Sequence, residues 1–465
     1  MVILEGEWAL ARPTKTQYEW QDNEVGMYIH WFPEDKHGYI SKMHKNENGE
    51  RLDKEIHKKL AQDVTCSTMN TDQWAETAVK MGAKYIVFVA KQNVGLCRWQ
   101  TDTDNELSMK NSPYKDGKGD IVQELSESCK KYGIKLGVYM CGDSLIYNAG
   151  HGGVVVVPER QKDYETAYDN GEVYDVAYWA NPEKNVEYVK LYRQWLTELL
   201  SRYGDMCEVW FDSSLKIDVR DILAKYAPNA VIFQSANATI RWVGNEEGWA
   251  YYPAWNSVKR YDAMTGTSFQ KHSNPDGEVW MPLECDVPIR KSFVYNPNPS
   301  NWIRSLDELM DLYYKSVGRG TTLLLNHGPH WEGHIIDEDY NRAKEFGDEV
   351  RRRFDNPIAE TSGEGEFVEI DLGKLQPVDH VVTMEDIRYG ERVRKYVIEG
   401  FDGEKWIQLA NGSAIGHKKI DFFPSVNVSK VRFRGLVAVG NPLIRSMKVY
   451  NVGTIPTGFT NNDEE

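Results

Sequence analysis

The feature that most restricts the fold is an alternation of short apolar segments with amphipathic helical segments over roughly the first 350 residues. The apolar segments are mostly continuous in character, which is typical of strands buried on both faces of a parallel sheet. They lie at residues 25–30, 85–89, 135–140, 208–211, 230–233, 279–283 and 321–325. This part of the chain is therefore predicted to form a parallel sheet with helices packed against it.

Helical segments lie between these strands and carry apolar residues three and four positions apart. They cover residues 71–81, 120–132, 185–203, 219–226, 305–317 and 337–354. No glycine-rich phosphate-binding loop follows an early strand, so the repeated units favour a TIM barrel of the (β/α)8 type over a doubly wound sheet. Because fewer than eight clear strand-then-helix units are visible, we expect either an irregular barrel or a barrel strand that the sequence pattern does not reveal.

The pattern changes after residue 355. Short runs of alternating polar and apolar residues follow, separated by Gly, Asp and Asn, which predicts an antiparallel β-sandwich. These runs lie at residues 367–372, 380–384, 394–399, 405–409, 418–423 and 430–434. We therefore expect a catalytic barrel at residues 1–355 and a C-terminal β-sandwich at residues 356–465.

Composition narrows the class of partner. The chain has 70 acidic and 55 basic residues, a formal charge of −15, so nucleic acid and anionic membranes are poor partners. It has no apolar run long enough to span a bilayer, and its first ten residues lack the pattern of a signal peptide. The six cysteines have no zinc-binding spacing, so neither a metal site nor a cofactor is predicted. The 15 Trp and 26 Tyr suit a sugar-binding surface.

Polar side chains at the ends of predicted strands are the candidates for a site, because barrel active sites lie at the carboxyl ends of the strands. Four strand ends carry such groups: His30 and Trp31, Gln92 and Asn93, Trp210 and Asp212, and Asn326 and His327. Asp212 is the sharpest case, because a carboxylate that directly follows an apolar strand loses hydration unless a partner or a function holds it there.

A retaining glycosidase needs two such carboxyl groups. One attacks the anomeric carbon, and the other protonates the leaving oxygen and then activates water. With Asp212 as the first, the second is sought among acidic residues of raised pKa. The candidates are Glu246, Glu247, Glu284 and Asp286, and spacing alone does not choose among them.

Several motifs, in order, resemble those of glycoside hydrolase family 29, the α-L-fucosidases. They are IHW at 29–31, GAKY at 82–85, NSPY at 111–114, WFD at 210–212, RWVGNE at 241–246, SVGRG at 316–320, EDI at 385–387 and GERV at 390–393. The resemblance implies an exo-acting, retaining enzyme that releases terminal α-L-fucose from oligosaccharides or glycoconjugates. It also implies an exported protein, either periplasmic or secreted.

The same resemblance implies roles for particular residues. Asp212 matches the nucleophile, and Glu246 matches the acid/base of one subgroup, with Glu284 as second choice. The residues expected to contact the sugar are His30, Trp31, Gln92, Asn93, Trp210 and Trp242.

One departure from the family concerns the sugar itself. Two adjacent histidines usually follow the Ala-Lys of the second strand, where this chain has Gln92 and Asn93. Amides both donate and accept hydrogen bonds, as a neutral imidazole does, so sugar binding is retained in principle. Two alternatives follow from the exchange: a glycosidase acting on a related galactose-configured glycoside, and a carbohydrate-binding relative without catalysis. Oligomeric state is not predicted by any feature of the sequence.

Overall fold

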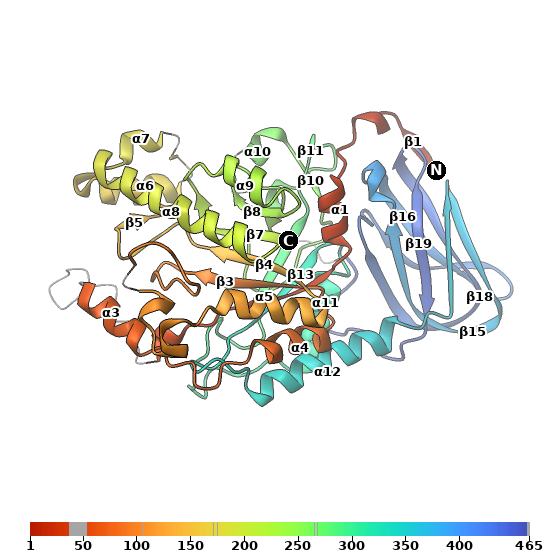
Figure 1. The fold of residues 1–465 in the computed structure, drawn as a ribbon. Coiled ribbons are helices and arrows are strands. Elements are labelled where there is room, and N and C mark those ends of the chain that lie inside the picture. The colour runs from red at the N-terminus through yellow and green to blue at the C-terminus, as the bar shows by residue number, and fades with distance from the viewer. Residues whose placement is uncertain are drawn as a thin grey trace.

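The computed structural model describes residues 1–36, 54–105, 107–170, 172–173, 175–264, 266 and 268–462. A barrel and a separate β-sheet domain lie side by side (Figure 1). The barrel sheet has eight parallel strands in the order β8-β7-β4-β3-β2-β13-β12-β9. Their bounds are β2 (Val25–Ile29), β3 (Tyr85–Lys91), β4 (Lys135–Met140), β7 (Met206–Leu215), β8 (Val231–Ser235), β9 (Arg241–Trp242), β12 (Leu283–Pro288) and β13 (Thr322–His327).

The ring is closed between β8 and β9 by a single parallel bridge that joins Phe233 to Ile240. The expectation of an irregular TIM barrel is thus confirmed. Strand β9 is the one without a sequence signal, because two residues are too few to show a pattern of hydrophobicity.

One predicted strand was placed wrongly. The segment at 279–283 contributes β11 (Val279–Trp280), which pairs antiparallel with β10 (Ser257–Val258), outside the barrel sheet. The barrel strand begins only at Leu283 and carries Glu284 and Asp286 within it. Glu284 and Asp286 interrupt the apolar pattern used for the prediction. Both point into the barrel, where Nε1 of Trp210 and Nε1 of Trp242 donate hydrogen bonds to them.

Helices cover the outside of the barrel, and six of them lie where the sequence predicts helical segments. They are α4 (Thr71–Met81), α5 (Ile121–Tyr132), α8 (Pro182–Arg202), α9 (Arg220–Tyr226), α11 (Leu306–Lys315) and α12 (Asp337–Phe354). The described residues also form α1 (Lys15–Gln21), α3 (Lys54–Gln62), α6 (Gln161–Asp169), α7 (Val176–Trp179) and α10 (Arg260–Met264).

Helix α5 shows why these segments fold as they do. Asp120 accepts a hydrogen bond from the backbone N–H of Gln123 and caps the start, while Gly133 ends the helix in the left-handed region at φ 68°. Between them Ile121 and Leu125 are fully buried against the barrel. Burial of each such side chain contributes about 1.5–3 kcal/mol.

The C-terminal domain is a seven-stranded sheet, antiparallel except at one edge, and confirms the predicted β architecture. Its strands are β14 (Ala359–Glu364), β15 (Phe367–Glu385), β16 (Val393–Phe401), β17 (Trp406–Gly412), β18 (Lys419–Val439) and β19 (Leu443–Tyr450), with β1 (Val2–Leu4) parallel to β18. The predicted strands at 367–372 and 380–384 are one long strand, β15, whose register shifts between Asp371 and Gln376. The turn-like residues there form an irregularity within the strand and do not end it.

The chain passes between the two domains twice, once after β1 and again after α12. Strand β1 lies in the C-terminal sheet, as the red segment beside the blue strands in Figure 1 shows. Across the interface Glu24 pairs with Lys418, and Tyr314 hydrogen-bonds His380 at 2.7 Å. The division of the chain at residue 355 stays a prediction. Residues 2–4, at the start of the chain, contribute a strand to the second sheet.

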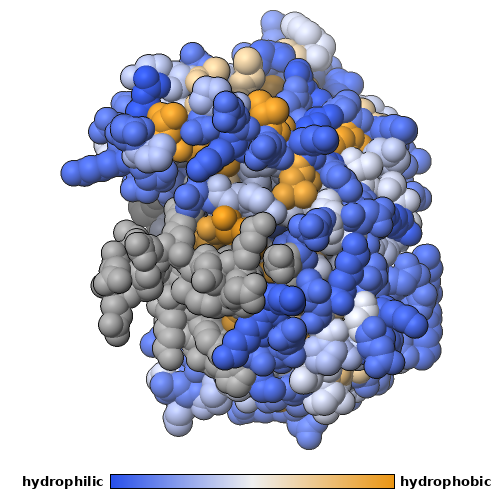
Figure 2. Space-filling model, turned by 60° about the vertical axis from the view of Figure 1, so that its left-hand side comes forward, coloured by the Kyte–Doolittle hydropathy of each residue, from blue (hydrophilic) through white to orange (hydrophobic). Residues whose placement is uncertain are grey.

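The molecular surface is mostly polar. The face in Figure 2 is largely hydrophilic, with small and separate hydrophobic areas. Across the described part of the chain, no helix combines the length and apolarity needed to cross a membrane. All six cysteines are free thiols.

Candidate active site

A cavity of about 550 Å³ opens at the carboxyl ends of the barrel strands. Six of the predicted site residues line it: His30, Gln92, Asn93, Trp210, Asp212 and Glu246. The remaining lining residues are Tyr28, Phe32, Val94, Tyr139, Cys141, Asp143, Ser213, Asp286, Phe293 and Val294. Segments more than 250 residues apart along the chain thus converge on one cavity.

Asp212 lies where β7 leaves the sheet. The pairing of β7 with β8 runs to Trp210 and resumes only at Leu215. In between, Ser213 and Ser214 have φ values of 57° and 47°, in the left-handed region that non-glycine residues rarely adopt. This backbone irregularity turns the Asp212 side chain into the cavity, an arrangement common beside active sites.

Two hydrogen bonds orient the Asp212 carboxylate. The hydroxyl of Tyr139 donates to Oδ2 at 2.8 Å, and the backbone N–H of Ser213 donates to Oδ1 at 2.8 Å. These two donors fix the direction of the Asp212 carboxyl group, which is what an attacking carboxylate requires.

Glu246 lies in the loop after β9, which Arg241 anchors. The buried guanidinium of Arg241 donates to the backbone oxygens of Met281 at 2.8 Å and of Phe269 at 2.7 Å. Beyond this anchor the Glu246 side chain is exposed at the cavity's rim. Partial loss of hydration, and then the negative charge of Asp212, raise the pKa of Glu246. A raised pKa suits a proton donor.

Asp286 is a third carboxyl group in the cavity. It is buried on β12 and accepts a 2.6 Å hydrogen bond from Nε1 of Trp242. Burial raises its pKa to about 8, so the group is protonated at neutral pH and can donate a hydrogen bond. Asp143 is a fourth, held by the backbone N–H groups of Gly152 and Gly153, and burial raises its pKa to about 6.

Glu284, the second choice for acid/base, lies deeper in the barrel and does not line the cavity. Residues two apart on a strand share a face, so Glu284 and Asp286 both point inward at different depths. Glu284 accepts hydrogen bonds from Nε1 of Trp210 at 2.9 Å and from the hydroxyl of Tyr85 at 3.0 Å. Burial raises the pKa of Glu284 and of the neighbouring Glu208, which share this apolar setting. The position of Glu284 fits a role in holding Trp210.

His30 is oriented by Asn326. The Asn326 amide donates through Nδ2 to the backbone oxygen of Phe293, so its Oδ1 accepts from Nδ1 of His30 at 2.7 Å. Burial lowers the pKa of His30 to about 4, which keeps the ring neutral. Nδ1 therefore carries the proton, and Nε2 is left as an acceptor for a sugar hydroxyl.

Two predicted sugar contacts are not among the cavity's lining residues. Trp31 is fully buried, and its Nε1 donates to the backbone oxygen of Trp331 at 3.1 Å. Trp242 lies behind Asp286 and binds its carboxyl group. Of the three tryptophans predicted to contact the sugar, Trp210 lines the cavity, stacked on Phe233 with ring centroids 3.8 Å apart.

Comparison with known proteins decides the family. The family model for alpha-L-fucosidase matches residues 4–353, most of the chain and the whole of the barrel. The chain belongs to the α-L-fucosidase family. It is therefore a glycoside hydrolase with a glycan substrate, as the motifs led us to expect.

Individual relatives agree with this assignment. Alpha-L-fucosidase 1 of Arabidopsis thaliana is 25% identical over 95% of this chain and 88% of its own length. The crystal structure of a glycoside hydrolase 29 family member from an unknown rumen bacterium is 28% identical, covers 98% of this chain and 80% of that one, and superposes with a TM-score of 0.73. A Ruminococcus gnavus GH29 fucosidase solved in complex with fucose shares the fold at 21% identity, with a TM-score of 0.75 over 100% of this chain and 98% of that one.

Several residues of this α-L-fucosidase-family cavity were missed by the sequence analysis. Tyr139 and Asp143 lie at and just after the end of β4, so the strand-end rule would have identified them had it been applied to that strand. Phe293 and Val294 come from an irregular loop after β12, for which no sequence pattern exists. Within the described residues, no group of three or more His, Cys, Asp or Glu side chains is arranged to hold a metal ion.

Proposed function

We propose that this protein is a retaining exo-glycosidase that hydrolyses terminal α-L-fucosyl residues, with Asp212 as nucleophile and Glu246 as general acid and base. The observation that carries the proposal is the pairing of two differently tuned carboxyl groups in one cavity. Asp212 is oriented by two donors, while the pKa of Glu246 is raised, in part by Asp212 itself. A raised pKa suits Glu246 to the acid role, and the two donors that orient Asp212 suit it to the attack.

The first step forms a covalent intermediate. An Asp212 oxygen attacks the anomeric carbon as the glycosidic C–O bond breaks, and Glu246 transfers its proton to the departing oxygen. In the second step the Glu246 carboxylate removes a proton from water. That water attacks the anomeric carbon and displaces Asp212, which releases the sugar with retained configuration.

Other cavity residues bind the sugar in this proposal. Nε2 of His30 accepts a hydrogen bond from a ring hydroxyl, and the amides of Gln92 and Asn93 donate and accept at the rim. Trp210 supplies an apolar face against the sugar ring. These groups act on the glycone, the sugar that is released.

Position supports Glu246 over Asp286 as the proton donor. Asp286 is buried and bonded to Trp242, whereas Glu246 is exposed and also borders a second cavity, through which a leaving group can depart. The acid must reach the oxygen between glycone and leaving group, and among the described residues Glu246 is the carboxyl group that lines both cavities.

The test is an azide-rescue series on an aryl α-L-fucoside. Asp212→Ala is expected to lose nearly all turnover, at least about 10³-fold, because the covalent step is removed. Glu246→Ala should be rescued by azide, and NMR of the early product should show retained configuration. Asp286→Ala is the matched control and should show no azide rescue. Full activity of Asp212→Ala, or rescue of Asp286→Ala in place of Glu246→Ala, contradicts the assignment.

A second candidate differs in the glycone. Gln92 and Asn93 line the cavity where the family usually carries two histidines, which favours a related galactose-configured substrate. A panel of nitrophenyl glycosides compares α-L-fucoside with galactosides, and a higher kcat/KM on a galactoside would favour this candidate. No turnover of any glycoside would favour a non-catalytic carbohydrate-binding protein. Export to the periplasm or the medium is also part of our proposal, by resemblance, and cell fractionation tests it.

A further inference from the structure

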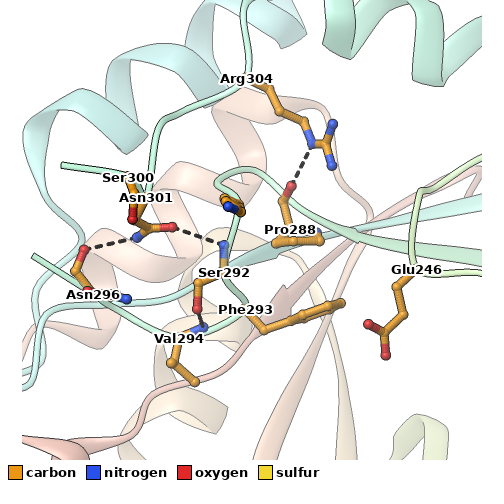
Figure 3. A pocket seen from close by; sticks show the side chains of 10 residues that line it. Glu246, Pro288, Ser292, Phe293, Val294, Asn296, Ser300, Asn301 and Arg304 are labelled. Carbon is orange, nitrogen blue, oxygen red and sulfur yellow. Dashed lines mark hydrogen bonds between the residues drawn. The ribbon is translucent and has the colours of Figure 1, made fainter. Parts of the chain in front are cut away.

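A second cavity of about 510 Å³ adjoins the first. It shares Glu246, Phe293 and Val294 with the catalytic cavity, so the proposed acid stands between the two. Figure 3 shows the Phe293 ring extending toward Glu246 at one end of this space. If Glu246 protonates the departing oxygen, the leaving glycan occupies the second cavity.

Arg304 is the most distinctive residue of this cavity. Its Nε donates to the backbone oxygen of Pro288 at 3.0 Å, which holds the half-buried guanidinium in place (Figure 3). Among the residues that the structure describes, no carboxylate lies within 4.0 Å of this guanidinium to form an ion pair. Loss of hydration lowers the pKa of Arg304. The guanidinium also lies 5.8 Å from the centre of the Trp302 ring, a cation–π contact that does not use its N–H donors.

The two acidic side chains whose charge acts on Arg304 have hydrogen-bond donors of their own. Glu308 and Glu247 act on Arg304 through their charge. However, Glu308 accepts a hydrogen bond from the Ser305 backbone N–H at 2.7 Å, and Glu247 accepts one from Nε1 of Trp249 at 2.9 Å. The terminal nitrogens of Arg304 thus remain available to a ligand.

The rest of the lining is cationic or neutral. Lys291 is exposed there and forms no ion pair with any residue in the described ranges. Asn301 is held by the backbone of Ser292 and Asn296, at 3.0 Å each, and Ser300 adds a hydroxyl. Among the described residues that line this cavity, Glu246 is the only one with a carboxylate, although the whole chain carries a net charge of −15. Two cations gathered in one cavity of so acidic a protein favour an anionic ligand.

We propose that this cavity binds an anionic group, a carboxylate or a sulfate, on the glycan that departs from fucose. Arg304 and Lys291 determine this preference, Arg304 by paired hydrogen bonds to the planar or tetrahedral anion and Lys291 by its charge. The proposal rests on the proposed function, because Glu246 defines which side of the scissile bond faces the cavity. The substrate class is therefore an acidic fucosylated oligosaccharide.

Kinetics on matched substrates test the preference. One fucosylated oligosaccharide is prepared in three forms: neutral, with a carboxylate-bearing sugar, and with a sulfate on the sugar next to fucose. The wild-type kcat/KM is expected to be about tenfold or more higher for an anionic form at low salt, and the ratio should fall as salt rises. Comparing kcat/KM for the two anionic forms distinguishes a preference for carboxylate from a preference for sulfate.

Substitutions then assign the preference to residues. Arg304→Met and Lys291→Met should each reduce the ratio of anionic to neutral kcat/KM, and together they should bring it close to one. Lys374→Met is the matched control. The substitution removes the same charge, and Lys374 is exposed on β15 in the other domain. A wild-type ratio of one, or equal losses on neutral and anionic forms in Arg304→Met, overturns the proposal.

A binding experiment separates this proposal from the proposed function. The inert Asp212→Ala protein is titrated by calorimetry with the fucose-free acidic oligosaccharide and its neutral counterpart. Tighter binding of the acidic form, lost in Asp212→Ala with Arg304→Met, supports the anionic site even if no fucoside is hydrolysed. Equal binding of the two forms overturns it whatever the enzyme's activity.

Discussion

The hydroxyl of Tyr139 donates a 2.8 Å hydrogen bond to Oδ2 of Asp212 from the neighbouring strand β4. The Tyr139 ring also stacks on Trp210, with centroids 5.4 Å apart. The Tyr139 side chain therefore connects the proposed nucleophile, Asp212, with Trp210, whose ring lines the cavity.

Tyr139→Phe is expected to lower kcat/KM about ten- to a hundredfold while leaving the fold intact. The change removes one hydrogen bond to a charged group, which contributes about 1.5–3 kcal/mol, but keeps the ring that packs on Trp210. Steady-state kinetics on an aryl fucoside measures it. Tyr164→Phe is the control, since the Tyr164 hydroxyl donates to the backbone oxygen of His151, away from Asp212. Equal effects of the two substitutions would contradict a specific role for Tyr139.

Glu246 should set the alkaline limb of the pH profile. The acid must be protonated to work, so kcat/KM falls as pH rises through its pKa. Because that pKa is raised, by partial desolvation and then by Asp212, the fall should begin above the range of an ordinary glutamate. Glu246→Gln removes the ionising group, and the residual activity should lose this limb. A limb that persists in Glu246→Gln but disappears in Asp286→Asn would transfer the role to Asp286.

Glu284→Ala should destabilise the barrel by roughly 3 kcal/mol, because two buried donors, Nε1 of Trp210 and the hydroxyl of Tyr85, lose their acceptor. Urea unfolding at neutral pH measures the loss. Glu187→Ala, an exposed position of α8, is the matched control and should change stability by less than about 0.5 kcal/mol. A loss of activity without any loss of stability would instead indicate that Glu284 takes part in the chemistry.

Glu24 should make the domain interface sensitive to acid. Burial alone would raise the pKa of Glu24, but Lys418 and His417 lower it to about 2, against 4.5 for the unpaired group. A lowered folded-state pKa stabilises the protein above pH 4.5, and this stabilisation is lost as pH falls from 4.5 toward 2. At about 1.4 kcal/mol per pKa unit, the shift from 4.5 to about 2 corresponds to roughly 3–4 kcal/mol of stability at neutral pH.

The measurement is the free energy of unfolding of wild type and Glu24→Gln between pH 7 and pH 3. The variant should be less stable at pH 7, and the difference should shrink steadily below pH 4.5. Glu19→Gln is the control, because its pairing with Lys15 lies on the surface. A difference between wild type and Glu24→Gln that is independent of pH would exclude the ion pair as its source.

Local patterns predicted much of the scaffold. The bounds of α4 and α12 follow the periodicity of their apolar residues, because a helix is built from contacts between near neighbours in the chain. Strand β4 was found in full for a similar reason, since it is continuously apolar after Lys135. Asp212 was identified as a candidate because it directly follows an apolar run. A carboxylate there loses hydration, at a cost in free energy, unless a partner or a function holds it.

Other features depend on closure of the barrel. Strand β9 exists only because its two residues pair with β12, and the register of β12 puts Asp286 in the cavity and Glu284 beneath Trp210. Nothing in the local sequence distinguishes these two acidic residues, which is why spacing left the choice of acid open.

The sequence by itself determined the alternation of strands and helices, the family resemblance and the choice of Asp212 as a candidate, because each depends on short-range pattern or on motifs contiguous in the chain. The tertiary structure alone decided which groups surround Asp212 and Glu246. Tyr139 reaches Asp212 from the neighbouring strand β4, and Arg304 shares a cavity with Glu246 from 58 positions further along the chain. Such proximity is produced by packing and closure of the barrel, which no local pattern of residues records.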